Sequence, residues 1–222
     1  MNVEEALRSR RSVRAFLDRP VPRIELQAIL DHAQWAPSNC NVQPWNTFIV
    51  SGEKLSLLRT SFAQLFKSGA SGKPSPEYGP MPMYEGVLQE RQYGSAAALY
   101  GAMNIERGDK VGRARASLRN WAFFDAPHVA VFTMEKHLQV MGGVDVGIYA
   151  QSLALLLKEH DIASCFQASL GYFPGPIRDL IAIPESHAIL FGMSFGYANT
   201  TAAANACRTT RAELTDSVIF VD

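Results

Sequence analysis

The side chains with the clearest chemical potential lie near the N-terminus, in the run Arg10-Arg11-Ser12-Val13-Arg14. This run places three guanidinium groups and one hydroxyl within five residues. A guanidinium donates hydrogen bonds in a planar fork that matches phosphate oxygens, so the run could bind a phosphate and a neighbouring polar ring edge. A basic helix end that complements the helix dipole would explain the same residues. From this run alone, both interpretations stay open.

A second polar segment runs from Ala36 to Trp45 and contains a polar loop between Pro37 and Pro44. Its side-chain amides, which both donate and accept hydrogen bonds, belong to Asn39, Asn41 and Gln43. Such a loop could read the edge of a heterocycle, for example that of a flavin. A capped turn between a helix and a strand is the alternative, because Asn and Ser are common in turns.

The histidines and cysteines predict neither a metal site nor a disulfide framework. The histidines are never within four residues of one another or of a cysteine, and the three cysteines form no C-x-x-C pair. The pattern Gly192-Met-Ser194-Phe-Gly196 fits a hydrolase nucleophile, but no histidine follows it in the chain. We therefore expect no metal and no dedicated side-chain nucleophile.

The composition is that of an ordinary globular protein with one domain, residues 1–222. Lys plus Arg and Asp plus Glu both total 21, so the net charge is zero and no global field favours nucleic acid or a membrane surface. The longest uncharged apolar run, Val146 to Leu157, is shorter than the roughly 20 residues of a membrane span. The N-terminus has no apolar signal region, and three separated cysteines fit a reducing compartment. We expect a cytoplasmic protein without a nucleic-acid or membrane partner.

Together, the two N-terminal motifs resemble those of the FMN-dependent nitroreductase family. They read R-x-S-x-R-x-F from Arg10 to Phe16 and A-P-S-x-x-N-x-Q-P-W from Ala36 to Trp45. The resemblance continues along the chain in Gly143-Val-Asp145-Val-Gly147, Phe166 to Ser169, Phe191 to Ala198 and Arg208 to Leu214. It implies an α+β, nitroreductase-like fold with a mainly antiparallel sheet around a buried helix, assembled as an intertwined homodimer.

The resemblance also implies which residues bind the cofactor. Arg10, Arg11 and Ser12 would contact the phosphate and ribityl chain of FMN, and Arg14 would lie at the pyrimidine edge, where its charge stabilises the reduced flavin. Arg211, with Arg208 as the second choice, would bind the phosphate from the C-terminal side.

Two further segments would reach the flavin. Backbone amides around Gln167, Ala168 and Ser169 would lie near flavin N5, although this chain lacks the Pro-x-Glu-Gly sequence that many relatives have there. The loop that contains Pro37, Ser38, Asn39 and Asn41 would reach the flavin of the partner subunit.

The implied reaction is a ping-pong transfer of electrons from NADH or NADPH, through FMN, to a small aromatic acceptor such as a nitro compound. Residues 68–124 would cap the pocket and select the acceptor, with a pattern similar to that of nitrobenzoate and nitrophenol reductases. For the arginines of this segment, a solvated helix face is the alternative. A reductive dehalogenase, or a flavin-binding sensor or storage protein without turnover, are the alternative functions.

The elements that would position these motifs follow from hydrophobic periodicity and capping residues. A capping box from Asn2 to Glu5 predicts a short helix that ends in the basic run. Further helices are expected at 26–33, 53–66, 87–105, 110–121, 143–159 and 174–181. Strands are expected at 46–50, 128–134, 163–166 and 188–197, with a separate strand-like tail at 217–221.

Two of these segments carry stronger expectations. The helix at 143–159 is apolar on nearly every side, which predicts burial all round. Residues 68–86 hold four prolines and four glycines, which predicts an exposed loop without regular structure.

Overall fold

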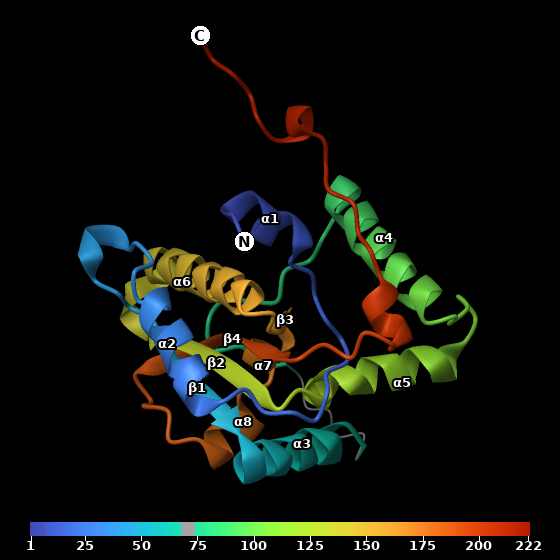
Figure 1. Ribbon diagram of the computed structural model, residues 1–222, viewed down its shortest axis with the longest axis horizontal. Coiled ribbons are helices and arrows are strands. Elements are labelled where there is room, and N and C mark those ends of the chain that lie inside the picture. The colour runs from blue at the N-terminus through green and yellow to red at the C-terminus, as the bar shows by residue number, and fades with distance from the viewer. Residues whose placement is uncertain (68–73) are drawn as a thin grey trace.

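The computed structural model describes residues 1–67 and 74–222. Figure 1 gives the arrangement of the elements. The helices are α1 (Val3–Ser9), α2 (Arg23–Ala33), α3 (Gly52–Lys67), α4 (Gly86–Ala102), α5 (Lys110–Trp121), α6 (Gln139–Glu159), α7 (Ser169–Tyr172) and α8 (Gly175–Leu180). The strands are β1 (Asn46–Ser51), β2 (His128–Glu135), β3 (Ala163–Gln167) and β4 (His187–Gly196).

One sheet of four strands, in the order β1-β2-β4-β3, forms the centre of the fold. All three strand pairs are antiparallel. Side chains alternate between the two faces of a strand, and in β2 Phe132 and Met134 face one core while Val129 and Val131 face the other. The predicted α+β class and antiparallel sheet are confirmed, and the sheet is buried on both faces.

Helices cover both faces of this sheet (Figure 1). On one face, α2 and α6 bury side chains such as Ile29, Tyr149 and Leu153 against the strands. On the other face, α3 and α8 bury Leu58 and Ile177. The capping box at the start of α1 is present, because Asn2 accepts from the Glu5 N–H at 2.9 Å and the Glu5 carboxylate accepts from the Asn2 N–H at 3.0 Å.

Helix α6 differs from its prediction in two ways. It begins at Gln139 rather than Gly143. Burial all round is wrong for the single chain, because Val140, Met141, Val144 and Ile148 are exposed. By length and composition the segment Lys136–Glu159 could cross a membrane, with a mean hydropathy of 1.5. Its inner side belongs to the core between α2 and the sheet, as expected for the central helix of a globular protein.

Helices α4 and α5 project from one side of the body (Figure 1), and neither contains a buried residue. Residues 74–85 lead into α4 without regular structure, as predicted, whereas 68–73 lie outside the described residues. Most of the described part is exposed, as predicted, and only Pro76, Glu77 and Tyr78 are half-buried. Glu77 is bound by the guanidinium of Arg178 and by the N–H of Ile189 at 2.8 Å, which fastens the base of the cap to β4.

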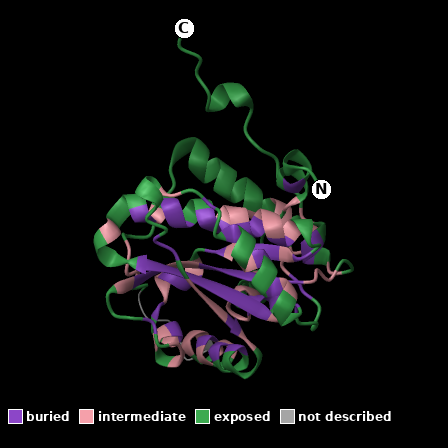
Figure 2. Ribbon diagram, turned by 60° about the vertical axis from the view of Figure 1, so that its left-hand side comes forward, coloured by how far each residue is buried: buried purple, intermediate pink, exposed green. Residues whose placement is uncertain are grey.

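The C-terminal tail leaves the body of the molecule (Figures 1 and 2). After a short turn at Leu214–Asp216 it has no regular structure. Ile219, Phe220 and Val221 are 86%, 78% and 91% exposed. The strand predicted at 217–221 therefore does not form within a single chain, because no sheet edge of the same chain lies beside it.

Candidate functional site

The arginine run lies in extended backbone directly after α1. The helix ends at Ser9, and Arg10 already has extended backbone angles. The Val13 N–H donates to the carbonyl oxygen of Ser164 at 3.0 Å, which fixes the run along β3. A basic helix end therefore does not account for these arginines, since only Arg8 lies in the last turn.

The C-terminal segment meets this run from the other side. Together they form a cavity with a volume of about 630 Å³. Six arginines line it and no carboxylate does, among the residues that the structure describes: Arg8, Arg10, Arg11, Arg14, Arg208 and Arg211. Ser12 and Cys207 add a hydroxyl and a thiol to the wall. Such a surface attracts an anion, because guanidinium groups have no acceptor for one another's protons.

Arg10 gives this cavity its most specific feature. Its Nε is buried, and no described residue accepts a hydrogen bond from it. Burial lowers the pKa of Arg10, and the cation of Arg211 lowers this pKa further. A buried donor without a partner costs about 1–3 kcal/mol, so an anion that accepts from Arg10 removes a penalty as well as forming a new bond.

The backbone of Arg14 is held at both its polar atoms. Its N–H donates to Oδ1 of Asn205 at 2.7 Å, and its carbonyl oxygen accepts from the Arg119 guanidinium at 3.2 Å. Asn205 is buried and lies in the short helical turn Ala203–Ala206. No sequence motif indicates this asparagine, because it follows a run of small residues and its partners Arg14 and Ala15 are 191 and 190 positions away.

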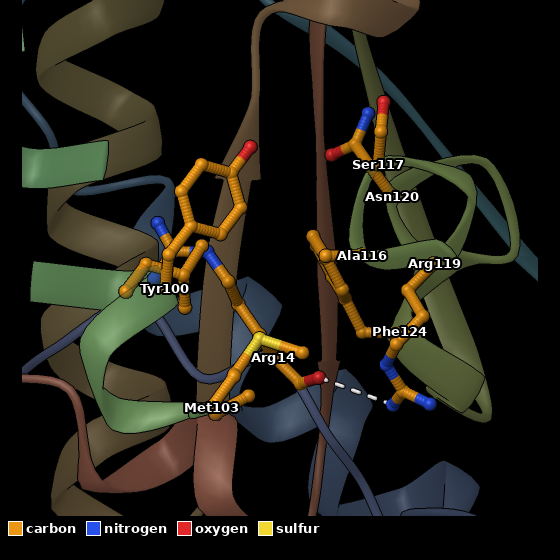
Figure 3. A pocket seen from close by; sticks show the side chains of 10 residues that line it. Arg14, Tyr100, Met103, Ala116, Ser117, Arg119, Asn120 and Phe124 are labelled. Atoms are coloured by element: carbon orange, nitrogen blue, oxygen red, sulfur yellow. Dashed lines mark hydrogen bonds between the residues drawn. The ribbon is translucent and has the colours of Figure 1, made fainter. Parts of the chain in front are cut away.

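A second, smaller cavity of about 190 Å³ lies between Arg14 and the cap (Figure 3). Tyr100 of α4 and Met103, which follows that helix, line one side, and Asn120 of α5 and Phe124 line the other. Arg14 thus lines both cavities and joins the cationic site to the underside of the cap.

Asn120 connects this cavity to the segment after β3. Its side-chain amide donates to Oγ of Ser169 at 2.7 Å, and its backbone oxygen accepts from Gln167 Nε2 at 2.7 Å. Ser194 completes the network by donating to Gln167 Oε1 at 2.5 Å. Gln167 and Ser169, which the sequence assigned to the cofactor site, therefore lie next to it, with Ala168 between them. Asn120 itself was missed, because a lone asparagine in a polar helix carries no pattern.

A strained turn places Phe124 in the wall of this cavity. Phe123, Phe124 and Asp125 have φ angles of 56°, 56° and 66°, and each such residue costs on the order of 1–3 kcal/mol. The guanidinium of Arg59 donates to the carbonyls on both sides of the turn, Ala122 at 3.2 Å and Ala126 at 2.5 Å. These bonds offset the strain, and strain of this kind is concentrated at functional sites.

The Pro37 to Asn41 loop lies away from these residues in the same chain. None of the cavities described above includes Pro37, Ser38, Asn39 or Asn41 in its lining. The loop is nevertheless well defined, since the buried carboxylate of Asp145 accepts from the Asn39 N–H at 3.1 Å. Cys40 and Asn41 also adopt left-handed backbone angles. The structure therefore brings together Arg10, Arg11, Ser12, Arg14, Arg208 and Arg211, but not this loop.

Comparison with known proteins gives the family. A model described as the nitroreductase family matches residues 7–197. The chain belongs to the nitroreductase family. The nitroreductase NfnB of Mycolicibacterium smegmatis is 35% identical, over 98% of this chain and 92% of its own length. The 4-nitrobenzoate reductase of Pseudomonas putida is also 35% identical, over 91% of this chain and 88% of its own length.

A solved nitroreductase structure agrees along the whole chain. The FMN- and NADPH-dependent NfnB of Sphigopyxis sp. strain HMH has a TM-score of 0.95 at 32% identity, with 100% of both chains covered. The nitroreductase fold expected from the motifs is thereby confirmed.

Proposed function

We propose that this nitroreductase family member binds FMN and transfers electrons from NADH or NADPH to small aromatic nitro compounds. The observation that carries the proposal is the cavity of six arginines in which the Nε of Arg10 has no partner. A phosphate dianion fits that donor set, and the Sphigopyxis relative is described as FMN- and NADPH-dependent. FMN, when bound, accepts a hydride from the nicotinamide and supplies electrons to the acceptor.

The residues divide into three roles under this proposal. Arg10, Arg11, Ser12, Arg208 and Arg211 bind the phosphate and the ribityl chain. Arg14, which joins the two cavities, places its charge at the pyrimidine edge. The segment Gln167, Ala168 and Ser169 offers backbone amides near N5, and Asn120 holds that segment in place.

We also propose that the protein acts as a homodimer in the cytoplasm, with residues 1–222 as one domain and 68–124 as the substrate cap. The exposed apolar side of α6 and the exposed tail support a dimer, because a single chain leaves both uncovered. The partner would then bring its Pro37, Ser38, Asn39 and Asn41 to the flavin. These residues lie on a fixed loop that lines neither cavity of its own chain.

We propose ping-pong kinetics, in which the nicotinamide leaves before the acceptor binds. Initial rates with varied NADPH and varied nitrobenzene should give parallel reciprocal plots. Halogenated phenols as acceptors test for a dehalogenase. A protein that binds flavin without oxidising NADPH under any acceptor would be a sensor or storage protein, and the proposal would be wrong.

Cofactor identity can be tested directly. No histidine lines the arginine cavity in the described chain, and Cys207 is the cysteine in its lining. We expect noncovalent FMN, so acid precipitation should release a yellow supernatant that contains FMN. Colour retained in the pellet, or FAD in the supernatant, would contradict this assignment.

A further inference from the structure

A third cavity lies in the cap, in the angle between α4 and the start of α5. Its volume is about 690 Å³. Tyr93 and Tyr100 of α4 line it, together with apolar side chains that include Ala97 and Ile105. Arg107 and Arg113 line the same space. We call this cavity the cap groove.

The groove follows from the spacing of residues on α4. Tyr93 and Tyr100 are seven residues apart, which places both rings on one side of the helix, two turns from each other. Between them lie small residues, among them Ala97, so no side chain fills the space between the two rings. A flat aromatic ligand fits such a space, because its faces can contact the tyrosine rings.

The two arginines of the groove have no acidic partner in the part of the chain that the structure describes. Neither Arg107 nor Arg113 forms an ion pair with any residue in the described ranges 1–67 and 74–222. Arg119, on the same helix as Arg113, pairs with Asp125 at 3.1 Å. Two guanidinium groups without a described acidic partner, next to apolar lining residues, suit a ligand that is apolar at one end and anionic at the other.

The cap groove adjoins the proposed flavin site, and one residue lines both. Tyr100 lines both the groove and the cavity that contains Arg14. A ligand beside Arg107 and Arg113 would therefore have its other end at Tyr100, next to the cavity that contains Arg14.

We propose that the cap groove selects acceptors that carry a carboxylate on the aromatic ring, and that Arg107 and Arg113 bind this carboxylate. The inference rests on the proposed function, whose acceptor it specifies. Arginine binds a carboxylate through paired hydrogen bonds. An uncharged nitrobenzene keeps the contacts with the tyrosines and loses these bonds.

The test compares 4-nitrobenzoate with nitrobenzene in the flavin-loaded protein. Arg113→Gln and Arg107→Gln each remove one charge, and Arg115→Gln on α5 is the matched control, because Arg115 is exposed and does not line the groove. One lost charged hydrogen bond corresponds to roughly a tenfold change. We expect kcat/KM for 4-nitrobenzoate to fall about tenfold in each groove variant, with nitrobenzene changed less than about twofold. An equal loss for both acceptors, or no loss for 4-nitrobenzoate, would overturn the inference.

The phosphates of the nicotinamide donor are another possible source of the anion. KM for NADPH and for NADH should each be unchanged in Arg107→Gln and Arg113→Gln if the groove binds the acceptor. A raised KM for NADPH alone, with unchanged kinetics toward 4-nitrobenzoate, would assign the arginines to the donor and overturn the inference.

Binding without turnover separates this inference from the proposed function. Benzoate, which cannot be reduced at a nitro group, should bind to the oxidised flavin-loaded protein, and its Kd by calorimetry should rise about tenfold in Arg113→Gln. If benzoate binds in this Arg113-dependent way but no nitro compound is reduced, the groove stands and the proposed function fails. If nitrobenzene is reduced but the Kd for benzoate is unchanged in Arg113→Gln, the proposed function stands and the groove inference fails.

Discussion

Asn205 pairs with the backbone of Arg14 as a neighbouring strand would. Its Oδ1 accepts from the Arg14 N–H at 2.7 Å, and its Nδ2 donates to the carbonyl oxygens of Ala15 and Asn199, both at 2.8 Å. One buried side chain thereby joins the N-terminal arginine run to the C-terminal segment that carries Arg208 and Arg211. The two halves of the arginine cavity are held in register by this amide.

The first prediction concerns Asn205→Asp, which keeps an acceptor for the Arg14 N–H. A carboxylate cannot donate to the two carbonyl oxygens, and it would face them as a buried charge. We expect the free energy of unfolding to fall on the order of 2–4 kcal/mol, measured by urea denaturation, and FMN affinity to weaken. Asn199→Ala is the control, because among the described residues its side chain accepts only from the N–H and hydroxyl of Thr201, two positions away. Equal stability of the wild type and Asn205→Asp would show that the amide is dispensable.

The second prediction concerns the dimer. Val144→Glu places a charge on the exposed apolar side of α6, where Val144 is 50% exposed. If that side is buried between subunits, the variant should dissociate to monomers and release FMN, as seen by light scattering. Ile24→Glu is the matched control, since Ile24 is 80% exposed on α2.

Deletion of residues 217–222 tests the tail in the same way. If the tail packs on the partner, its loss should lower the melting temperature by several degrees, as expected for about 1–2 kcal/mol, and loosen FMN. An unchanged melting temperature and mass for the truncated protein would remove the tail from the interface.

The third prediction concerns the pH dependence of stability. The buried ring of His128 accepts from the Val21 N–H through Nε2 at 2.8 Å and contacts Ser51 Oγ through Nδ1 at 2.5 Å. Burial lowers the pKa of His128 below its ordinary value of 6.5. Above that pH the ring is neutral in both folded and unfolded chains, so its contribution to stability is constant.

Below about pH 6.5 the unfolded chain binds a proton that the folded chain does not, so stability should fall with pH by at most about 1.4 kcal/mol per unit. This fall in stability should end once the pH is below the pKa of His128 in the folded chain. His128→Asn should remove this part of the pH dependence, whereas His32→Gln, at an exposed position, should keep it. Urea denaturation of each variant from pH 5 to 8 measures the difference. An unaltered profile in His128→Asn would contradict the assignment.

The sequence predicted the four strands closely because each carries an apolar run between turn residues. It missed the first turn of α6 because Gly142 and Gly143 look like a helix boundary. In the structure an added Cβ at Gly142 would be 2.7 Å from Leu138 Cβ and 2.9 Å from the sulfur of Met134. Close packing against Leu138 and against β2 therefore explains a glycine that local preference would keep out of a helix.

The residues of the candidate site likewise divide into those that a local motif predicts and those that depend on distant partners. Arg10, Ser12 and Arg14 were predictable because a short motif carries them. Asn205 acts on a residue 191 positions away, and Asn120 on residues 47 and 49 positions away. Such long-range partners leave no local pattern. The left-handed turn at Phe123 to Asp125 was equally hidden, because bulky residues seldom adopt those angles without a tertiary contact such as Arg59 supplies.

The last prediction separates the roles of two arginines in the same run. Arg10 lines the cationic cavity, and its buried Nε has no partner among the described residues, whereas Arg14 lines both that cavity and the one under the cap. Arg10 should therefore contribute to cofactor retention, and Arg14 to stabilising the negative charge that reduction adds to the flavin. A preorganised positive charge of this kind stabilises the reduced flavin more than the oxidised flavin.

Arg14→Gln keeps much of the side-chain length and deletes the charge. We expect flavin reduction by NADPH to slow by the equivalent of about 2–4 kcal/mol, with a lower flavin potential and little change in affinity for oxidised FMN. Arg10→Gln should do the reverse, since it chiefly weakens FMN binding. Stopped-flow reduction, potentiometry and FMN titration on both variants measure each effect. If Arg14→Gln is reduced at the wild-type rate with an unchanged potential, Arg14 only shapes the cavity. The electrostatic role would then have to come from another donor at that edge.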